Sequence, residues 1–131
     1  MKRVLLTGLL LMMAACNPST AQAKLTKGLK TILSWTATAQ MVGETWQQGA
    51  VPQQYAQQTL AKSQQEIEKE IQGLSAPPTL EQPLQQLQQT LQQLTVAVQQ
   101  RNKAAIASSL QQLAIEQQQL DTFAKAQGEQ P

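Results

Sequence analysis

Few residue types in this chain could carry chemistry, and they are thinly spread. There is one cysteine, Cys16, and one acidic cluster, formed by Glu66, Glu68 and Glu70, while histidine is absent from all 131 residues. Without histidine the chain has no Ser–His or Cys–His nucleophile pair and no Glu-x-x-His metal motif, and a lone thiol forms no internal disulfide. We therefore expect no catalytic residues, no metal ligands and no cofactor, and we predict that the protein is not an enzyme.

The acidic cluster allows two interpretations. Three carboxylates over 66–70 could hold a cation, or they could lie on a solvated helix face. Helical spacing favours the second interpretation, because Lys62 and Lys69 stand four and three residues from Glu66 and can pair with it. Glu68 would also lie on a different face from Glu66 and Glu70, so the three carboxylates would not converge.

The N-terminus has the pattern of a targeting segment that ends at the cysteine. Lys2 and Arg3 precede an apolar run over 4–13, which is about half the length needed to cross a bilayer. The run leads into Met-Ala-Ala-Cys over 13–16. This ending resembles the lipobox of bacterial lipoproteins, with Met13 at the position where leucine is usual.

The lipobox resemblance implies how the chain is processed. It places signal cleavage between Ala15 and Cys16, which removes residues 1–15, and it makes Cys16 the site of lipid attachment, as in palmitate-bearing lipoproteins. An ordinary secretory signal, cleaved after Ala23, is the alternative. In the first case residues 16–23 form a lipidated N-terminus and a polar tether.

Removal of residues 1–15 would also change the charge of the chain. The full sequence has 10 Lys and Arg against 8 Asp and Glu, so the loss of Lys2 and Arg3 leaves eight of each sign. A neutral chain lacks the basic surface that nucleic-acid binding requires, so we expect no nucleic-acid partner. We expect an exported protein that its lipid anchors to a bacterial membrane, on the periplasmic, luminal or cell-surface face.

From Lys24 onward, hydrophobic residues recur at helical spacing and glutamine pairs fill many of the gaps. Glycine or proline interrupts the pattern at 49–52 and 73–78, and a milder break follows at 101–103. The breaks predict four helices over about 24–48, 52–72, 79–100 and 103–126. Their similar lengths and short connections predict an all-α, up-down-up-down antiparallel four-helix bundle over 24–127, followed by a flexible tail over 128–131.

The third and fourth predicted helices have the clearest apolar seams. The seam of the third helix consists of Leu80, Leu84, Leu87, Leu91, Leu94 and Val98, and that of the fourth of Ile106, Leu110, Leu113, Leu120 and Ala124. Gln117 interrupts the fourth seam and would need a partner or an exposed position. Thr79 and Gln82 predict a capping box at the start of the third helix, and Asn102 is the predicted N-cap of the fourth.

Three aromatic residues are candidate partner contacts. Trp35, Trp46 and Tyr55 lie in or beside the first predicted helical hairpin, and tryptophan and tyrosine often anchor interfaces. Alternatively they fill the end of the bundle, where Trp46 and Tyr55 could pack on each other across the turn. Trp35 is the best candidate for a partly exposed anchor.

Small residues in the middle of the first predicted helix also have two interpretations. Thr36, Ala39 and Gly43 could leave a cavity for an apolar ligand, or they could let a neighbouring helix approach closely. Close packing is the commoner reason for such a stripe.

The sequence thus predicts a membrane-anchored lipoprotein that acts by binding, or as an accessory or structural subunit, through a glutamine-rich bundle. Its expected partners are the membrane, through the lipid, and a membrane-protein complex. The combination of a lipobox and a four-helix bundle is similar to that of the PsbQ-type extrinsic lipoproteins of photosystem II, which implies an accessory subunit of a photosynthetic complex as one alternative. A carrier of a small apolar ligand is another.

Overall fold

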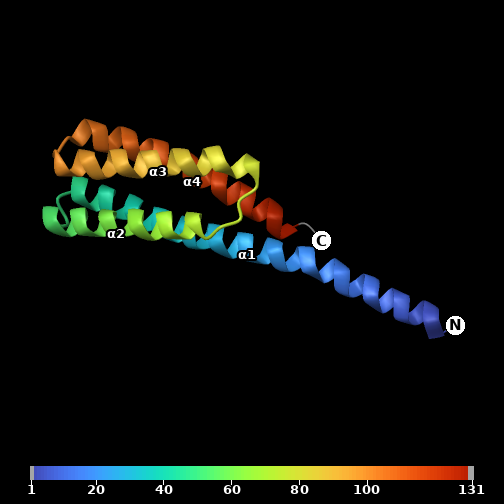
Figure 1. Ribbon diagram of the computed structural model, residues 1–131. Helices are drawn as coiled ribbons and strands as arrows, with labels where there is room; N and C mark the ends of the chain where they lie inside the picture. Colours follow the sequence, from blue (N-terminus) through green and yellow to red (C-terminus); the bar gives the residue numbers. More distant parts are fainter. Residues whose placement is uncertain (1, 130–131) are drawn as a thin grey trace.

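The protein is an all-helical four-helix bundle, seen in a computed structural model that describes the backbone of residues 2–129 and the side chains of residues 21–127 (Figure 1). The helices are α1 (Lys2–Gln47), α2 (Gln53–Gln72), α3 (Pro78–Gln99) and α4 (Lys103–Glu129). Each helix packs mainly on its neighbours, with α1 against α2 and α4, and α3 against α2 and α4. This confirms the predicted fold class.

Two segments expected to be irregular are helical. The structure begins α1 at Lys2 rather than near Lys24, so the expected polar tether over 17–23 is part of the helix, and α1 extends beyond the other three helices (Figure 1). The residues on both sides of 17–20 are strong helix formers, and extending a formed helix costs far less than starting one, although Asn17, Pro18, Ser19 and Thr20 themselves disfavour a helix interior. For the same reason α4 continues to Glu129, into the expected tail.

Two of the helix ends share one backbone motif. After α1, the amides of Gly49 and Ala50 donate to the carbonyls of Trp46 and Thr45. Gly49 has a positive φ of 74°, the left-handed conformation that this Schellman motif requires.

The end of α3 repeats this motif with arginine in place of glycine. The amides of Arg101 and Asn102 donate to the carbonyls of Val98 and Ala97, and Arg101 has a φ of 55°. Asn102 then caps α4, because its Oδ1 accepts the amide of Ala105 at 3.1 Å, as predicted.

The predicted capping box at Thr79 is wrong. The N-cap residue of α3 is Pro77, and no side chain caps this end. Proline is favoured at the first helical position because its missing N–H is not needed there and its φ is already helical. Pro78 therefore begins the helix one residue before Thr79, which is exposed.

The core contains the predicted seams. All six apolar residues of the third seam and all five of the fourth are buried. The core also includes Leu29, Ile32, Ala39 and Val42 of α1 and Ala56, Leu60 and Ile67 of α2. Two polar residues of α4, Ser109 and Glu116, are also buried, at 7% and 3% exposure, whereas Gln117 is half-buried.

Candidate binding groove between α3 and α4

Glu116 is a buried carboxylate with one satisfied oxygen. Its Oε2 accepts a hydrogen bond from Thr90 Oγ1 at 2.8 Å and one from Gln112 Nε2 at 3.0 Å. Its Oε1 is buried and has no hydrogen-bond partner among the residues that the structure describes. Leaving a buried polar atom unsatisfied costs about 1–3 kcal/mol, and more for a charged group. Most buried side-chain polar atoms in proteins have a hydrogen-bond partner, so Oε1 of Glu116 is unusual.

Helix geometry explains why Glu116 faces inward. It follows Leu113 by three residues and precedes Leu120 by four, and both leucines are fully or almost fully buried. Residues at these spacings share one helix face. Helical spacing from Leu113 allows either Glu116, three residues on, or Gln117, four residues on, to face the core. The predicted seam had Gln117 at this position and therefore missed Glu116.

Glu116 lines a polar pocket of about 370 Å³ between α3 and α4. Thr90 and Ser109 are buried beside it, and four of the eight lining residues are glutamines. These glutamines are Gln86, Gln89, Gln93 and Gln112. Glu116 is the one ionisable residue among the residues that line this pocket, so the pocket combines a single carboxylate with amides and hydroxyls.

A second, less polar hollow of about 520 Å³ continues the pocket toward the α3–α4 turn. The two hollows share the side chains of Gln89, Gln93, Ser108 and Ser109. Beyond these, the second hollow is lined by Val96, Ala97, Gln100 and Ala105, together with Gln92. We call the two hollows together the α3–α4 groove.

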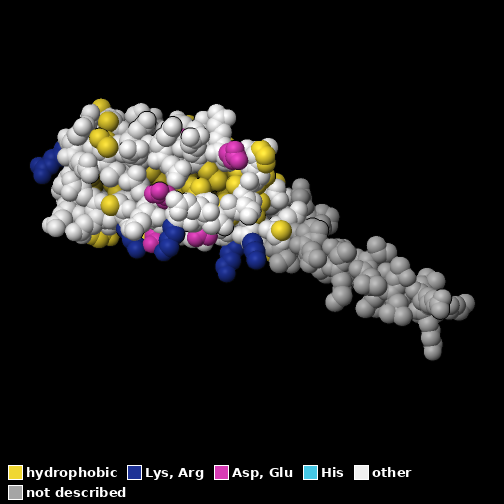
Figure 2. Space-filling model, in the orientation of Figure 1, with side chains coloured by type: hydrophobic (Ala, Val, Ile, Leu, Met, Phe, Trp, Pro, Cys, Tyr) yellow, Lys and Arg dark blue, Asp and Glu magenta, His cyan; other side chains and the backbone are white. Residues whose placement is uncertain are grey.

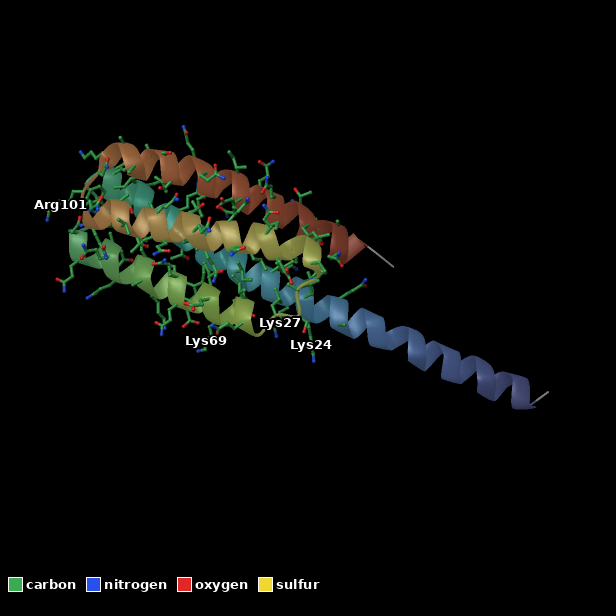
Figure 3. All side chains as sticks on the ribbon, turned by 45° about the horizontal axis from the view of Figure 1, so that its top comes forward. Lys24, Lys27, Lys69 and Arg101 are labelled. Atoms are coloured by element: carbon green, nitrogen blue, oxygen red, sulfur yellow. The ribbon has the colours of Figure 1, made fainter. Side chains whose placement is uncertain are left out.

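Charged side chains cover only a small part of the face shown in Figure 2. In Figure 2 most of the surface shown carries neither lysine, arginine nor acidic side chains, and most of the lysines and arginines follow the edge formed by α1 and α2. In Figure 3, Lys24, Lys27 and Lys69 lie near the end at which α1 leaves the bundle, and Arg101 lies at the opposite end. The α3–α4 groove is therefore distinct from the lysine-bearing edge.

The lipid-attachment residue predicted from the sequence lies outside the described side chains. Cys16 and the cleavage residue Ala15 are within α1, but the side-chain description begins at residue 21.

The three aromatic candidates do not form one patch. Trp35 and Trp46 are half-buried against the core, whereas Tyr55 is 51% exposed. The indole N–H of Trp46 donates to Gln53 Oε1, and Gln53 Nε2 donates to the backbone carbonyl of Val98. Trp46 thus belongs to a contact that joins the ends of α1, α2 and α3, and Tyr55 is the most exposed of the three candidates.

The acidic residues of α2 lie along a solvated face. Lys62 Nζ contacts Glu66 Oε1 at 2.9 Å, and the hydrogen bond from Lys62 is the main cause that lowers the pKa of Glu66 below its ordinary value. Glu68 is exposed, while Glu66 and Glu70 are half-buried. Among the described residues no three His, Cys, Asp or Glu side chains are grouped so that they could hold a metal ion.

The small residues of α1 pack closely against other helices. Thr36 and Ala39 are fully buried. A Cβ atom added to Gly43 would lie 2.9 Å from Leu110 Cδ2 and 3.4 Å from Leu94 Cδ1, so neighbouring side chains already occupy that space. This geometry supports the close-packing interpretation of the stripe.

Within the part of the chain that the structure describes, no helix has a stretch long and apolar enough to cross a membrane. Comparison of the chain with protein-family models, with curated proteins and with solved structures gave no match.

Proposed function

We propose that the chain is a membrane-anchored extracytoplasmic lipoprotein that binds a partner or ligand in the α3–α4 groove and performs no catalysis. One observation carries the binding role: a hollow of about 370 Å³ between α3 and α4 is lined by Glu116, a buried carboxylate, together with glutamine, serine and threonine side chains. The lipobox resemblance of residues 13–16 supports the anchor. The groove is lined chiefly by amides, hydroxyls and small apolar side chains, which suit recognition better than proton transfer.

The proposed mechanism is tethering. Lipid on Cys16 would hold α1 at the membrane, and α1 is also one wall of the bundle, so the whole bundle would be confined to the surface. Confinement raises the effective concentration of the groove for partners in the same membrane. Because the α3–α4 turn is at the end of the bundle remote from the N-terminus of α1, the hollow beside this turn, lined by Gln100 and Ala105, would lie far from the lipid (Figure 1).

Lipid labelling in cells tests the anchor. We expect the wild-type chain to incorporate an alkyne-labelled palmitate and to begin at Cys16, and we expect the Cys16→Ser variant to incorporate none. An unlabelled wild-type chain that begins at Lys24, as cleavage after Ala23 would produce, contradicts the anchor. The mass of the purified mature chain distinguishes the two outcomes.

Site-specific photocrosslinking in intact cells tests the binding role. A photoreactive residue at Gln93, in the groove, is expected to capture a partner, whereas one at Gln65, exposed on α2, is the matched control. Equal capture from both positions, or none from Gln93, contradicts a role for the groove. Capture of a photosystem II subunit from Gln93 would favour the PsbQ-like alternative.

A further inference from the structure

The lysines of the chain are distributed unevenly over the bundle. Lys24 and Lys27 of α1 and Lys69 of α2 project from the same side, near the end at which α1 leaves the bundle (Figure 3). All three are exposed, and among the described side chains the two salt bridges belong to Lys62 and Lys125. Lys24, Lys27 and Lys69 are therefore positive charges without a salt bridge in the described part of the chain.

Two lines of residues at seven-residue spacing define the surface to which these lysines belong. The first line follows α1 and consists of Lys27, Ser34 and Met41, and the second follows α2 and consists of Tyr55, Lys62 and Lys69. Seven residues are nearly two helical turns, so each line stays on one side of its helix. All six side chains are exposed.

The two lines run side by side in opposite directions, because α1 and α2 pack as an antiparallel pair. The indole of Trp46 bonds to Gln53 at the start of α2, and Gly28 lies against Leu74, just past the end of α2. The lysine ends of the two lines are therefore at the same end of the pair, and so are their apolar ends. We call the surface formed by the two lines, together with Lys24, the α1–α2 face.

Two acidic residues of these helices lie on other sides of the bundle. Glu68 lines a hollow of about 210 Å³ together with residues of α3. Glu44 is three residues before Gln47, whose Nε2 donates to the backbone carbonyl of Lys103, so Glu44 is on the side of α1 that faces α4. Neither carboxylate belongs to the α1–α2 face.

The α1–α2 face has an excess of positive charge. Its four lysines stand against the two carboxylates of Glu66 and Glu70, both half-buried, and Glu66 is paired with Lys62. From Cys16 onward the chain has eight charges of each sign, so four positive and six negative charges are left for the rest of it. A chain with no net charge is therefore electrically asymmetric.

The residue types of this face favour a lipid surface over a protein partner. Lysine is depleted from protein–protein interfaces, where arginine is enriched, whereas lysines close to a membrane are attracted by anionic lipids. Met41 and Tyr55 are 58% and 51% exposed at the other end of the face, and tyrosine is enriched where a membrane meets water. Both ends of the face thus suit the surface of a membrane.

The helical register of α1 connects this face with the predicted lipid. Cys16 precedes Ser34 by 18 residues, which are five complete helical turns, and α1 is continuous over this range. The two backbone positions therefore have the same register on the helix. A lipid at position 16 would hold α1 with the α1–α2 face toward the membrane, and this step rests on the anchor proposed above.

We propose that the α1–α2 face lies on the anionic surface of the membrane that anchors the chain. Because the tether already holds the chain there, attraction of a few lysines is enough to select this orientation. Since α2 and α4 each pack between α1 and α3, the side formed by α3 and α4 is opposite the α1–α2 face. The α3–α4 groove is then directed away from the lipids, where a partner can reach it.

Fluorescence quenching on vesicles measures this orientation. The chain that begins at Cys16 is coupled through that thiol to a maleimide lipid, and a fluorescent amino acid is placed at Ser34, on the α1–α2 face, or at Gln93, in the groove. Lipids with a nitroxide on the head group quench nearby fluorophores. In vesicles that contain phosphatidylglycerol we expect strong quenching at Ser34 and little at Gln93, and high salt should weaken the quenching at Ser34.

A pair of charge variants tests the role of the lysines. One lysine close to an anionic surface contributes about a fivefold preference, so Lys24→Gln/Lys27→Gln should lower the ratio of bound to unbound orientations about 25-fold. Arg101→Gln/Lys103→Gln removes the same charge from exposed residues at the α3–α4 turn and should leave quenching at Ser34 unchanged. An unchanged Tm in both variants confirms that folding is intact.

Three results would overturn the proposal. These are equal quenching at Ser34 in phosphatidylcholine vesicles with and without phosphatidylglycerol, equal quenching at Ser34 and Gln93, and unchanged quenching in Lys24→Gln/Lys27→Gln. The maleimide lipid supplies the tether whether or not cells lipidate Cys16. If palmitate labelling in cells fails, the anchor falls, while the vesicle result still decides whether the α1–α2 face binds anionic lipid.

Discussion

At the scale of single residues, one buried carboxylate differs from the other charged side chains, which lie at the surface or are half-buried. Among the side chains that the structure describes, Glu116 is the one buried ionisable residue, and its carboxylate accepts hydrogen bonds from Thr90 of α3 and Gln112 of its own helix. The contact with Thr90 also ties α4 to α3 across the groove. The exposed ion pairs contribute far less to stability, because water and salt screen them.

The pair formed by Lys62 and Glu66 predicts a pH effect of known sign. Lys62→Met removes the hydrogen bond that lowers the pKa of Glu66, so this pKa should rise toward its ordinary value. In the wild type, the stabilisation from a lowered carboxyl pKa is present above the unfolded-state pKa and is lost as the pH falls through the folded-state pKa. The difference in stability between wild type and variant should therefore shrink in acid.

Carboxyl NMR titration checks the pKa, and urea unfolding at several pH values checks the stability. Lys125→Met is the matched control, because it breaks another exposed pair, with Asp121 at 3.1 Å, on a different helix. A Glu66 titration that is the same in the Lys62→Met variant and the wild type would contradict the assignment of its cause.

At the scale of helices, two turns with the same hydrogen bonds differ in their key residue. Gly49 and Arg101 occupy the left-handed position after α1 and α3. A left-handed conformation costs a non-glycine residue about 1–2 kcal/mol, of which about 0.4–1 kcal/mol is offset because glycine makes the unfolded chain more flexible. Arg101→Gly should therefore stabilise the bundle by roughly 0.5–1 kcal/mol.

Gly49→Ala is the reciprocal variant and should destabilise by a similar amount. A Cβ at Gly49 would meet no atom within 4 Å, so any loss reflects backbone conformation rather than a clash. Urea unfolding measures both variants. The explanation fails if Arg101→Gly lowers the free energy of unfolding.

At the scale of the whole molecule, Gln53 connects three helices at one end of the bundle. Its amide accepts from Trp46 of α1 and donates to the carbonyl of Val98 in α3, while its backbone begins α2. Loss of two such hydrogen bonds in Gln53→Ala should cost roughly 1–2 kcal/mol in the free energy of unfolding. Gln54→Ala, at an exposed neighbour, should change it by less than about 0.5 kcal/mol.

The Gln53 prediction is checked by chemical unfolding and by amide exchange. Faster exchange should appear together at the ends of α1, α2 and α3, because one side chain joins them. Faster exchange confined to α2 would show that the bridge does not couple the helices.

Much of the fold followed from local pattern. The leucine seam of α3 and the cap at Asn102 depend on residues a few positions apart, so helical spacing alone was sufficient to predict them. The start of α3 was misassigned because Thr79 and Pro78 both favour a helix start, and only the folded chain selects one. The α1 boundary was misassigned because a polar segment between strong helix formers can remain helical.

The sequence by itself determined the helical periodicity, the absence of histidine, and the lipobox-like ending at Cys16, because these are properties of residue type and spacing. Only the tertiary structure decided that Glu116 is buried against Thr90, with one oxygen hydrogen-bonded and the other buried without a partner among the described residues. The physical reason is that an unsatisfied buried atom depends on what a neighbouring helix supplies. Thr90 and Glu116 are 26 positions apart, and no local pattern links them.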